Sequence, residues 1–299
     1  MSHSNQQHWA MIAVALSGAI WGIFWIPLRA TEAAGISAVW TIVLFYLLPL
    51  CVLFPGYFLR WRQLIEGGPK LHIACMFAGV SLALYAGAFL FTTVVNAMLL
   101  YYLTPIWSTL LARAALGEFI TRDRWVTIAL GLLGMQVVLG GGLSLPWPQN
   151  IGDWMGLAAG ILWAVASVMI RRDNTIHAAD YTLGYFLWGT LAALLLTQLP
   201  WAEGQHVPSW QLLSETMPVL APIIILLVIP PSVAVLWGAK LLSPGLLGII
   251  FMTEISVGAI TAAIWAGEPF GTREILGITL ITAAGLWEPV RDIVGRHTS

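Results

Sequence analysis

Long apolar segments follow one another along this whole chain, and they limit its possible folds more than any other feature. Of the 299 residues, 59% are hydrophobic and only 9% are charged, whereas about a quarter of the residues of a typical soluble domain are charged. So few charges cannot cover a surface that faces water, so lipid must solvate much of the chain. Since a helix of roughly 20 apolar residues spans a bilayer, we expect an all-α integral membrane protein.

Pro, Gly and charged residues divide the apolar sequence into segments of helical length. We predict ten transmembrane helices, at about residues 9–31, 36–59, 70–93, 96–116, 122–144, 152–171, 180–199, 215–240, 243–266 and 273–291. The connections between them are short, except for residues 200–214. The N-terminal sequence MSHSNQQHWA lacks the basic stretch of a signal peptide, so we expect the first segment to be a genuine span.

The distribution of basic residues predicts the orientation, because cytoplasmic loops are rich in Lys and Arg. If the N-terminus is cytoplasmic, the inner connections and the C-terminal tail hold Arg60, Arg62, Lys70, Arg113, Arg122, Arg124, Arg171, Arg172, Lys240, Arg291 and Arg296. Only Arg29 and Arg273 then fall outside. The opposite orientation would reverse this ratio, so we expect both termini in the cytoplasm.

Two sequence blocks recur in the same order in the two halves of the chain. SGAIWGIFWIPLR (17–29) aligns with AAGILWAVASVMIR (158–171), and LTPIWSTLLARAALGEFITR (103–122) aligns with MTEISVGAITAAIWAGEPFGTR (252–273). The matched pairs include Gly18 with Gly160, Trp21 with Trp163, and Thr104 with Thr253. Because each half holds five helices, an odd number, the second copy starts on the opposite side of the membrane. We therefore predict two inverted five-helix repeats, residues 1–145 and 146–299, around a central cavity.

The Gly-Glu pairs that end the fourth and ninth helices (117–118 and 267–268), the ten spans and the five-plus-five repeat resemble the drug/metabolite transporter superfamily, EamA type. The resemblance covers essentially the whole chain and is nearest to bacterial exporters of aromatic amino acids. It implies a protein of the cell inner membrane that works by alternating access and exports Phe, Trp and Tyr, with flat aromatic cations as further substrates. It implies the lipid bilayer as surroundings, no cofactor and no nucleic-acid partner.

The fourth predicted helix carries more polar groups than lipid would favour. Tyr101, Pro105 and Ser108 share one face, which suits a cavity or a close helix partner. Pro105 removes one backbone hydrogen bond and leaves the carbonyl of Tyr101 free. We predict that Tyr101 lines the cavity, whereas helix packing remains an alternative for the rest of the face. The helix start at Asn96 offers free N–H groups to a substrate carboxylate, although capping alone also explains this residue.

Glu254 is the one carboxylate that the predicted spans place near the midplane, where an ionisable group is costly and usually functional. It could bind a substrate ammonium or couple protons, or it could form a structural pair with Lys240, Arg113 or a tyrosine. Trp21 and Trp163 lie about eleven residues into their spans, too deep for an interfacial belt. These two are predicted to stack on an aromatic substrate and to attract its ammonium.

Tyr85 is a further candidate at similar depth in the third segment, where core packing is the alternative. No sequence pattern of a hydrolase, metalloprotease or nucleotide-binding loop occurs, and Cys51 and Cys75 form no disulfide or metal framework. The chain is therefore not expected to be an enzyme. The alternative to an aromatic amino acid exporter is a proton-coupled exporter of cationic drugs or of another small metabolite.

Overall fold

The computed structural model describes residues 3–92, 94–139, 147–173, 175–199, 206–265 and 270–297, and every regular element in these ranges is a helix. The helices are α1 (His3–Trp21), α2 (Trp25–Ala33), α3 (Ala38–Val52), α4 (Phe54–Leu59), α5 (Trp61–Glu66), α6 (Gly68–Phe91), α7 (Val94–Tyr101), α8 (Thr104–Leu116), α9 (Arg122–Leu139), α10 (Ile151–Arg172), α11 (Ala178–Leu196), α12 (Trp210–Leu241), α13 (Pro244–Phe251), α14 (Thr253–Trp265) and α15 (Thr272–His297).

Among the residues that the structure describes, six helical segments are long and apolar enough to cross a membrane, so the chain is a multi-pass membrane protein. They are Asn5–Ala33, Gly68–Phe91, Ile151–Arg172, Ala178–Leu196, Trp210–Leu241 and Pro244–Trp265. The apolar helix α3 is shorter than a full span. Each of the ten predicted ranges contains helix, although four of them are broken, at residues 22–24, 53, 102–103 and 252. The short helix α5 was not predicted.

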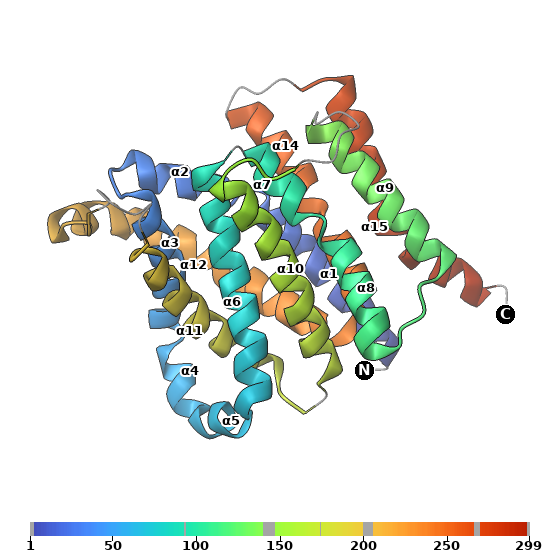
Figure 1. The fold of residues 1–299 in the computed structure, drawn as a ribbon, viewed down its shortest axis with the longest axis horizontal. Helices are drawn as coiled ribbons and strands as arrows, with labels where there is room; N and C mark the ends of the chain where they lie inside the picture. Colours follow the sequence, from blue (N-terminus) through green and yellow to red (C-terminus); the bar gives the residue numbers. More distant parts are fainter. Residues whose placement is uncertain are drawn as a thin grey trace.

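The helices pack in an arrangement that brings the two halves of the chain into contact. α6 packs along α10 and α11, α1 packs along α12, and α9 lies beside α15 (Figure 1). Helices α4 and α5 and the start of α1 lie at one end of the molecule, toward the bottom of Figure 1. The buried core therefore combines side chains from both halves, including Ala10, Leu82, Trp163 and Phe186.

Polar contacts tie helices together at both ends of α6. At the end nearest α5, the Arg60 guanidinium donates to both carboxylate oxygens of Asp180, at 2.5 and 2.9 Å. These hydrogen bonds raise the pKa of Arg60. At the opposite end of α6, the Thr92 hydroxyl donates to Asp153 of α10 at 2.5 Å. A first-half residue thus contacts a second-half helix at each end.

One close helix contact involves two glycines, Gly79 on α6 and Gly189 on α11. A Cβ atom built on Gly79 would lie 2.5 Å from the backbone nitrogen of Gly189 and 2.9 Å from its Cα. Small residues permit such close approach of membrane helices. The α6–α11 contact therefore tolerates no side chain at residue 79 without separation of the two backbones.

We expect Gly79→Ala to destabilise the protein by about 2 kcal/mol, the usual range for an overpacked contact. Gly285→Ala on α15 is the matched control, because a Cβ there meets nothing within 4 Å. Thermal unfolding of the purified variants in detergent measures the difference. Equal melting temperatures for the two variants would contradict the described α6–α11 contact.

Candidate functional site

The fourth predicted helix breaks between α7 and α8, and the sequence explains why. Pro105 has no N–H group, so the carbonyl of Tyr101 cannot accept the usual helical hydrogen bond. The hydroxyl of Thr104 donates to this carbonyl at 2.5 Å and also lies 3.2 Å from the carbonyl of Gly160 on α10. The free carbonyl predicted from Pro105 is therefore capped by a side chain beside it.

A second break separates α13 from α14. The N–H of Ile255 donates to the carbonyl of Met252 at 3.0 Å and so does not close the helical bond to Phe251. The hydroxyl of Thr253 donates to the carbonyl of Ala15 on α1 at 2.9 Å. The carbonyl of Phe251 is left for another donor, and the hydroxyl of Tyr102 lies 3.4 Å from it.

Glu254 lies in the first turn of α14, directly after this break, and is only 3% exposed. Its Oε1 accepts a hydrogen bond from the Tyr85 hydroxyl at 3.1 Å, and its Oε2 accepts one from the Tyr102 hydroxyl. In the part of the chain that the structure describes, Glu254 forms no salt bridge. Lys240 donates to the carbonyl of Ile176 instead. Two tyrosines are thus the partners of this carboxylate.

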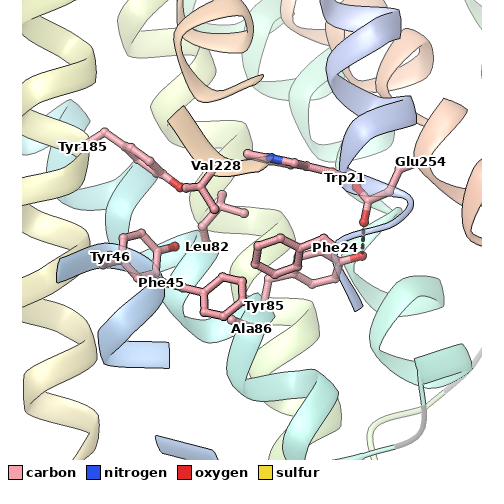
Figure 2. Close-up of a pocket in the computed structure, with 10 residues that line it drawn as sticks. All are labelled: Trp21, Phe24, Phe45, Tyr46, Leu82, Tyr85, Ala86, Tyr185, Val228 and Glu254. Atoms are coloured by element: carbon pink, nitrogen blue, oxygen red, sulfur yellow. Dashed lines mark hydrogen bonds between the residues drawn. The ribbon is translucent and has the colours of Figure 1, made fainter. Parts of the chain in front are cut away.

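A cavity lies beside Glu254 (Figure 2), and the space between its lining atoms, including the part open to the outside, is about 430 Å³. Its lining consists of six aromatic side chains, three aliphatic ones and one carboxylate: Trp21, Phe24, Phe45, Tyr46, Tyr85, Tyr185, Leu82, Ala86, Val228 and Glu254. Figure 2 shows Tyr46 and Tyr185 on the side of the cavity opposite Glu254. The described lining contains no Lys or Arg, so an aromatic molecule bearing a positive charge fits its chemistry best.

Tyr101 lies behind this wall. Its ring stacks on that of Tyr85, with centroids 4.0 Å apart and an angle of 21° between the planes, and the residue is 2% exposed. It is absent from the described cavity lining, although the sequence predicted it there. Its position instead fixes the Tyr85 ring, which does line the cavity.

The two pseudo-equivalent tryptophans occupy different positions at the cavity. Trp21 lines it, donates its indole N–H to the carbonyl of Leu227 at 3.1 Å, and packs edge-on against Phe251 with centroids 5.1 Å apart. Trp163 lies with Trp21, Tyr185 and Ser232 around a second, tightly packed space that has no room for a water molecule. Trp21 therefore borders both spaces, whereas Trp163 borders only the second.

The two remaining predicted residues lie apart from the cavity lining or outside the described side chains. Ser108 is 1% exposed, and its hydroxyl has no hydrogen-bond partner in the described structure. It is not part of the cavity lining. The backbone of Asn96 lies in α7, near its start, and its side chain is outside the described residues.

Sequence reasoning missed Tyr102 and most of the cavity wall. From the sequence, Tyr102 points away from the face of Tyr101 and could hydrogen-bond between helices, but nothing in the sequence indicates that its partner is Glu254. Phe45 and Tyr46 lie near the middle of the second apolar segment. Their depth within the predicted membrane span could have suggested both residues. However, α3 is apolar around its whole circumference, so no periodicity in the sequence marks the face that turns toward the cavity.

Comparisons with known proteins show what this chain is similar to. No curated protein matches the sequence. Among solved structures 29 chains match; one of them, described only as a crystal structure of a protein, has a TM-score of 0.71, 17% identity, and covers 97% of this chain and 99% of its own. This likeness shows the fold alone.

The described residues contain no group of three or more His, Cys, Asp or Glu that could hold a metal ion.

The model of the EamA-like transporter family matches residues 150–287. This range includes Trp163 on α10 and Glu254 at the α13–α14 break. The second half of the chain is therefore similar to a family of membrane transporters.

Proposed function

We propose that the protein exports small aromatic molecules that carry an ammonium group, with the aromatic amino acids Phe, Trp and Tyr as its expected substrates. One observation carries this proposal: six aromatic side chains and a single buried carboxylate line the same cavity. Aromatic faces stack on an aromatic substrate and attract a cation, with about 0.5–2 kcal/mol for each cation–π contact. Glu254 supplies the negative charge that pairs with the ammonium.

We propose further that residues 1–145 and 146–299 form inverted halves that open the cavity alternately to either side. Two matching contacts support this. A Cβ on Gly160 would lie 2.6 Å from the carbonyl of Tyr101, at the α7–α8 break, and a Cβ on Gly18 would lie 2.8 Å from the carbonyl of Phe251, at the α13–α14 break. Each matched glycine therefore packs its helix against the broken helix of the opposite half.

The proposed orientation has both termini in the cytoplasm and places the protein in the cell inner membrane. The excess of Lys and Arg in the connections assigned to the inner side supports it. Export in this orientation requires the cavity to load from the end of the molecule where α4, α5 and the start of α1 lie (Figure 1).

A second candidate is the proton-coupled export of aromatic cations that lack a carboxylate. The cavity lining favours it in one respect, because no Lys or Arg is present among the described lining residues. The carboxylate of an amino acid would meet only neutral donors there, such as the hydroxyls of Tyr46 and Tyr185. Burying a charge without an opposite charge is costly.

Transport by purified protein in proteoliposomes distinguishes the two candidates. Radiolabelled phenylalanine and phenethylamine share one ring and one ammonium and differ in the carboxylate, and lysine serves as the non-aromatic control. Saturable phenylalanine transport without need of a pH gradient is the expected result. Transport of phenethylamine alone, and only with a pH gradient, would establish the second candidate. Transport of neither compound would overturn both.

A further inference from the structure

Tyr102 contacts both sides of the break between α13 and α14. Its hydroxyl reaches Oε2 of Glu254, in the first turn of α14, and lies 3.4 Å from the carbonyl of Phe251, the last residue of α13. Tyr102 itself occupies the break between α7 and α8, where its N–H donates to Met98 at 2.8 Å. One side chain therefore joins the broken helices of the two halves.

The ring of Tyr102 is held in place. It is 1% exposed and packs edge-on against Tyr101, with centroids 5.2 Å apart and planes at 86°. Because the ring is fixed, the freedom that remains is rotation of the hydroxyl proton about the C–O bond. A hydroxyl has one proton, so Tyr102 donates either to Glu254 or to the carbonyl of Phe251.

The choice between these acceptors depends on the charge of Glu254. A free carboxylate is the stronger acceptor and draws the proton, since hydrogen bonds to ionised groups are roughly twice as strong as neutral ones. An ammonium ion bound at Glu254 reduces this advantage. The proton of Tyr102 then turns to the carbonyl of Phe251, which lacks a partner in its own helix.

We propose that Tyr102 is a positioning residue that transmits the occupancy of Glu254 to the α13–α14 break. With Glu254 empty, Tyr102 binds the carboxylate and leaves the end of α13 uncapped. With Glu254 occupied, Tyr102 caps α13 and stabilises the broken conformation. The proposal rests on the proposed function only in naming an ammonium as the occupant; the link between Glu254 and the break is independent of substrate.

Tyr85 provides a matched comparison. Its hydroxyl donates to the other oxygen of Glu254, at 3.1 Å, and its ring is also buried. No hydrogen bond joins Tyr85 to Phe251 in the described structure. Tyr85→Phe and Tyr102→Phe therefore each remove one hydroxyl from the carboxylate, but only Tyr102→Phe removes the contact with the break.

Amide hydrogen exchange in lipid nanodiscs, without substrate, tests the link directly. Glu254→Gln serves as the neutral mimic of the occupied state. We expect Glu254→Gln to slow exchange in peptides that cover residues 249–258 by about five-fold, the effect of one net hydrogen bond. In a Tyr102→Phe background the same substitution should have no effect, whereas in a Tyr85→Phe background it should slow exchange as in the unmodified protein.

Transport kinetics supply the second measurement. Both Tyr→Phe variants remove a donor that competes for Glu254, so both should lower KM for phenethylamine or phenylalanine by a similar factor. Only Tyr102→Phe should also lower the maximal rate, because substrate binding at Glu254 then no longer changes the hydrogen bonding at the α13–α14 break. Equal maximal rates, or an exchange effect of Glu254→Gln that persists in Tyr102→Phe, would overturn the proposal.

The exchange and transport results separate this proposal from the proposed function. If neither substrate is transported but the exchange effect depends on Tyr102, the substrate assignment fails and the Tyr102 link stands. If transport occurs and the exchange effect is independent of Tyr102, the link fails and the substrate assignment stands. Melting temperatures of all variants within a few degrees of the unmodified protein establish that each variant is folded.

Discussion

Glu254→Gln is expected to lower kcat/KM for phenylalanine or phenethylamine by about 100-fold, since loss of one partner of a buried charge pair costs about 2–5 kcal/mol. The reason is that Glu254 supplies the only negative charge in the described cavity lining. Glutamine keeps the size of the side chain and one acceptor oxygen for a tyrosine hydroxyl. The packing around α14 should therefore persist while the attraction for an ammonium is lost.

The measurement is the initial rate of transport into proteoliposomes across a range of substrate concentrations. Glu215→Gln is the control, because it makes the same chemical change at an exposed residue of α12. Its kcat/KM should stay within two-fold of the unmodified protein, as expected for about 0.5 kcal/mol at a surface residue. An unchanged kcat/KM in Glu254→Gln for both substrates would remove Glu254 from the binding site.

Trp21→Ala is expected to have a larger effect on transport than Trp163→Ala. Trp21 borders both the cavity and the second, tightly packed space, whereas Trp163 borders only the second. Loss of the Trp21 ring removes a face for the substrate and the edge-on contact with Phe251. It also leaves the carbonyl of Leu227 without its indole donor. We expect KM for phenylalanine to rise about 10–30-fold, in line with about 1.5–2 kcal/mol for aromatic and cation–π contacts.

Because Trp→Ala in a core costs about 3–5 kcal/mol of stability, binding must be separated from folding. Trp21→Phe keeps a ring at the cavity and should recover most of the affinity, although it still lacks the N–H donor. Trp125→Ala on α9, where the side chain is 50% exposed, controls for loss of an indole elsewhere. A larger rise in KM for Trp163→Ala than for Trp21→Ala would contradict the assignment of Trp21 as the main aromatic contact of the substrate.

The positions of the helices were predictable because lipid solvation imposes a simple condition on sequence. Each span needs a long apolar run, and backbone hydrogen bonds must be satisfied within the helix. The α7–α8 break was also readable, since Pro105 cannot donate to Tyr101. The α13–α14 break has no proline, and it depends on Thr253 donating to Ala15 of a distant helix. A contact 238 residues away in sequence leaves no local signal.

The candidate site likewise has one part that was predictable from the sequence and one part that was not. A carboxylate within an apolar run identified Glu254, because an ionisable group at that depth is costly wherever it faces. A tyrosine partner was one of the alternatives that the sequence left open, but the sequence could not decide among them or say which tyrosines pair with Glu254. Tyr85 and Tyr102 come from α6 and from the α7–α8 break, and only helix packing brings their hydroxyls to the two oxygens of one side chain.

The sequence by itself thus determined that lipid surrounds much of the chain, that the fold is helical and that Glu254 lies within an apolar segment, since each of these follows from composition along a single segment. Only the tertiary structure decided which aromatic residues line the cavity, with Tyr46 and Tyr185 at its wall and Tyr101 behind Tyr85. The physical reason is that helices apolar on all sides carry no periodic mark of their inner face. Which side chains meet is then set by the packing of one helix against another.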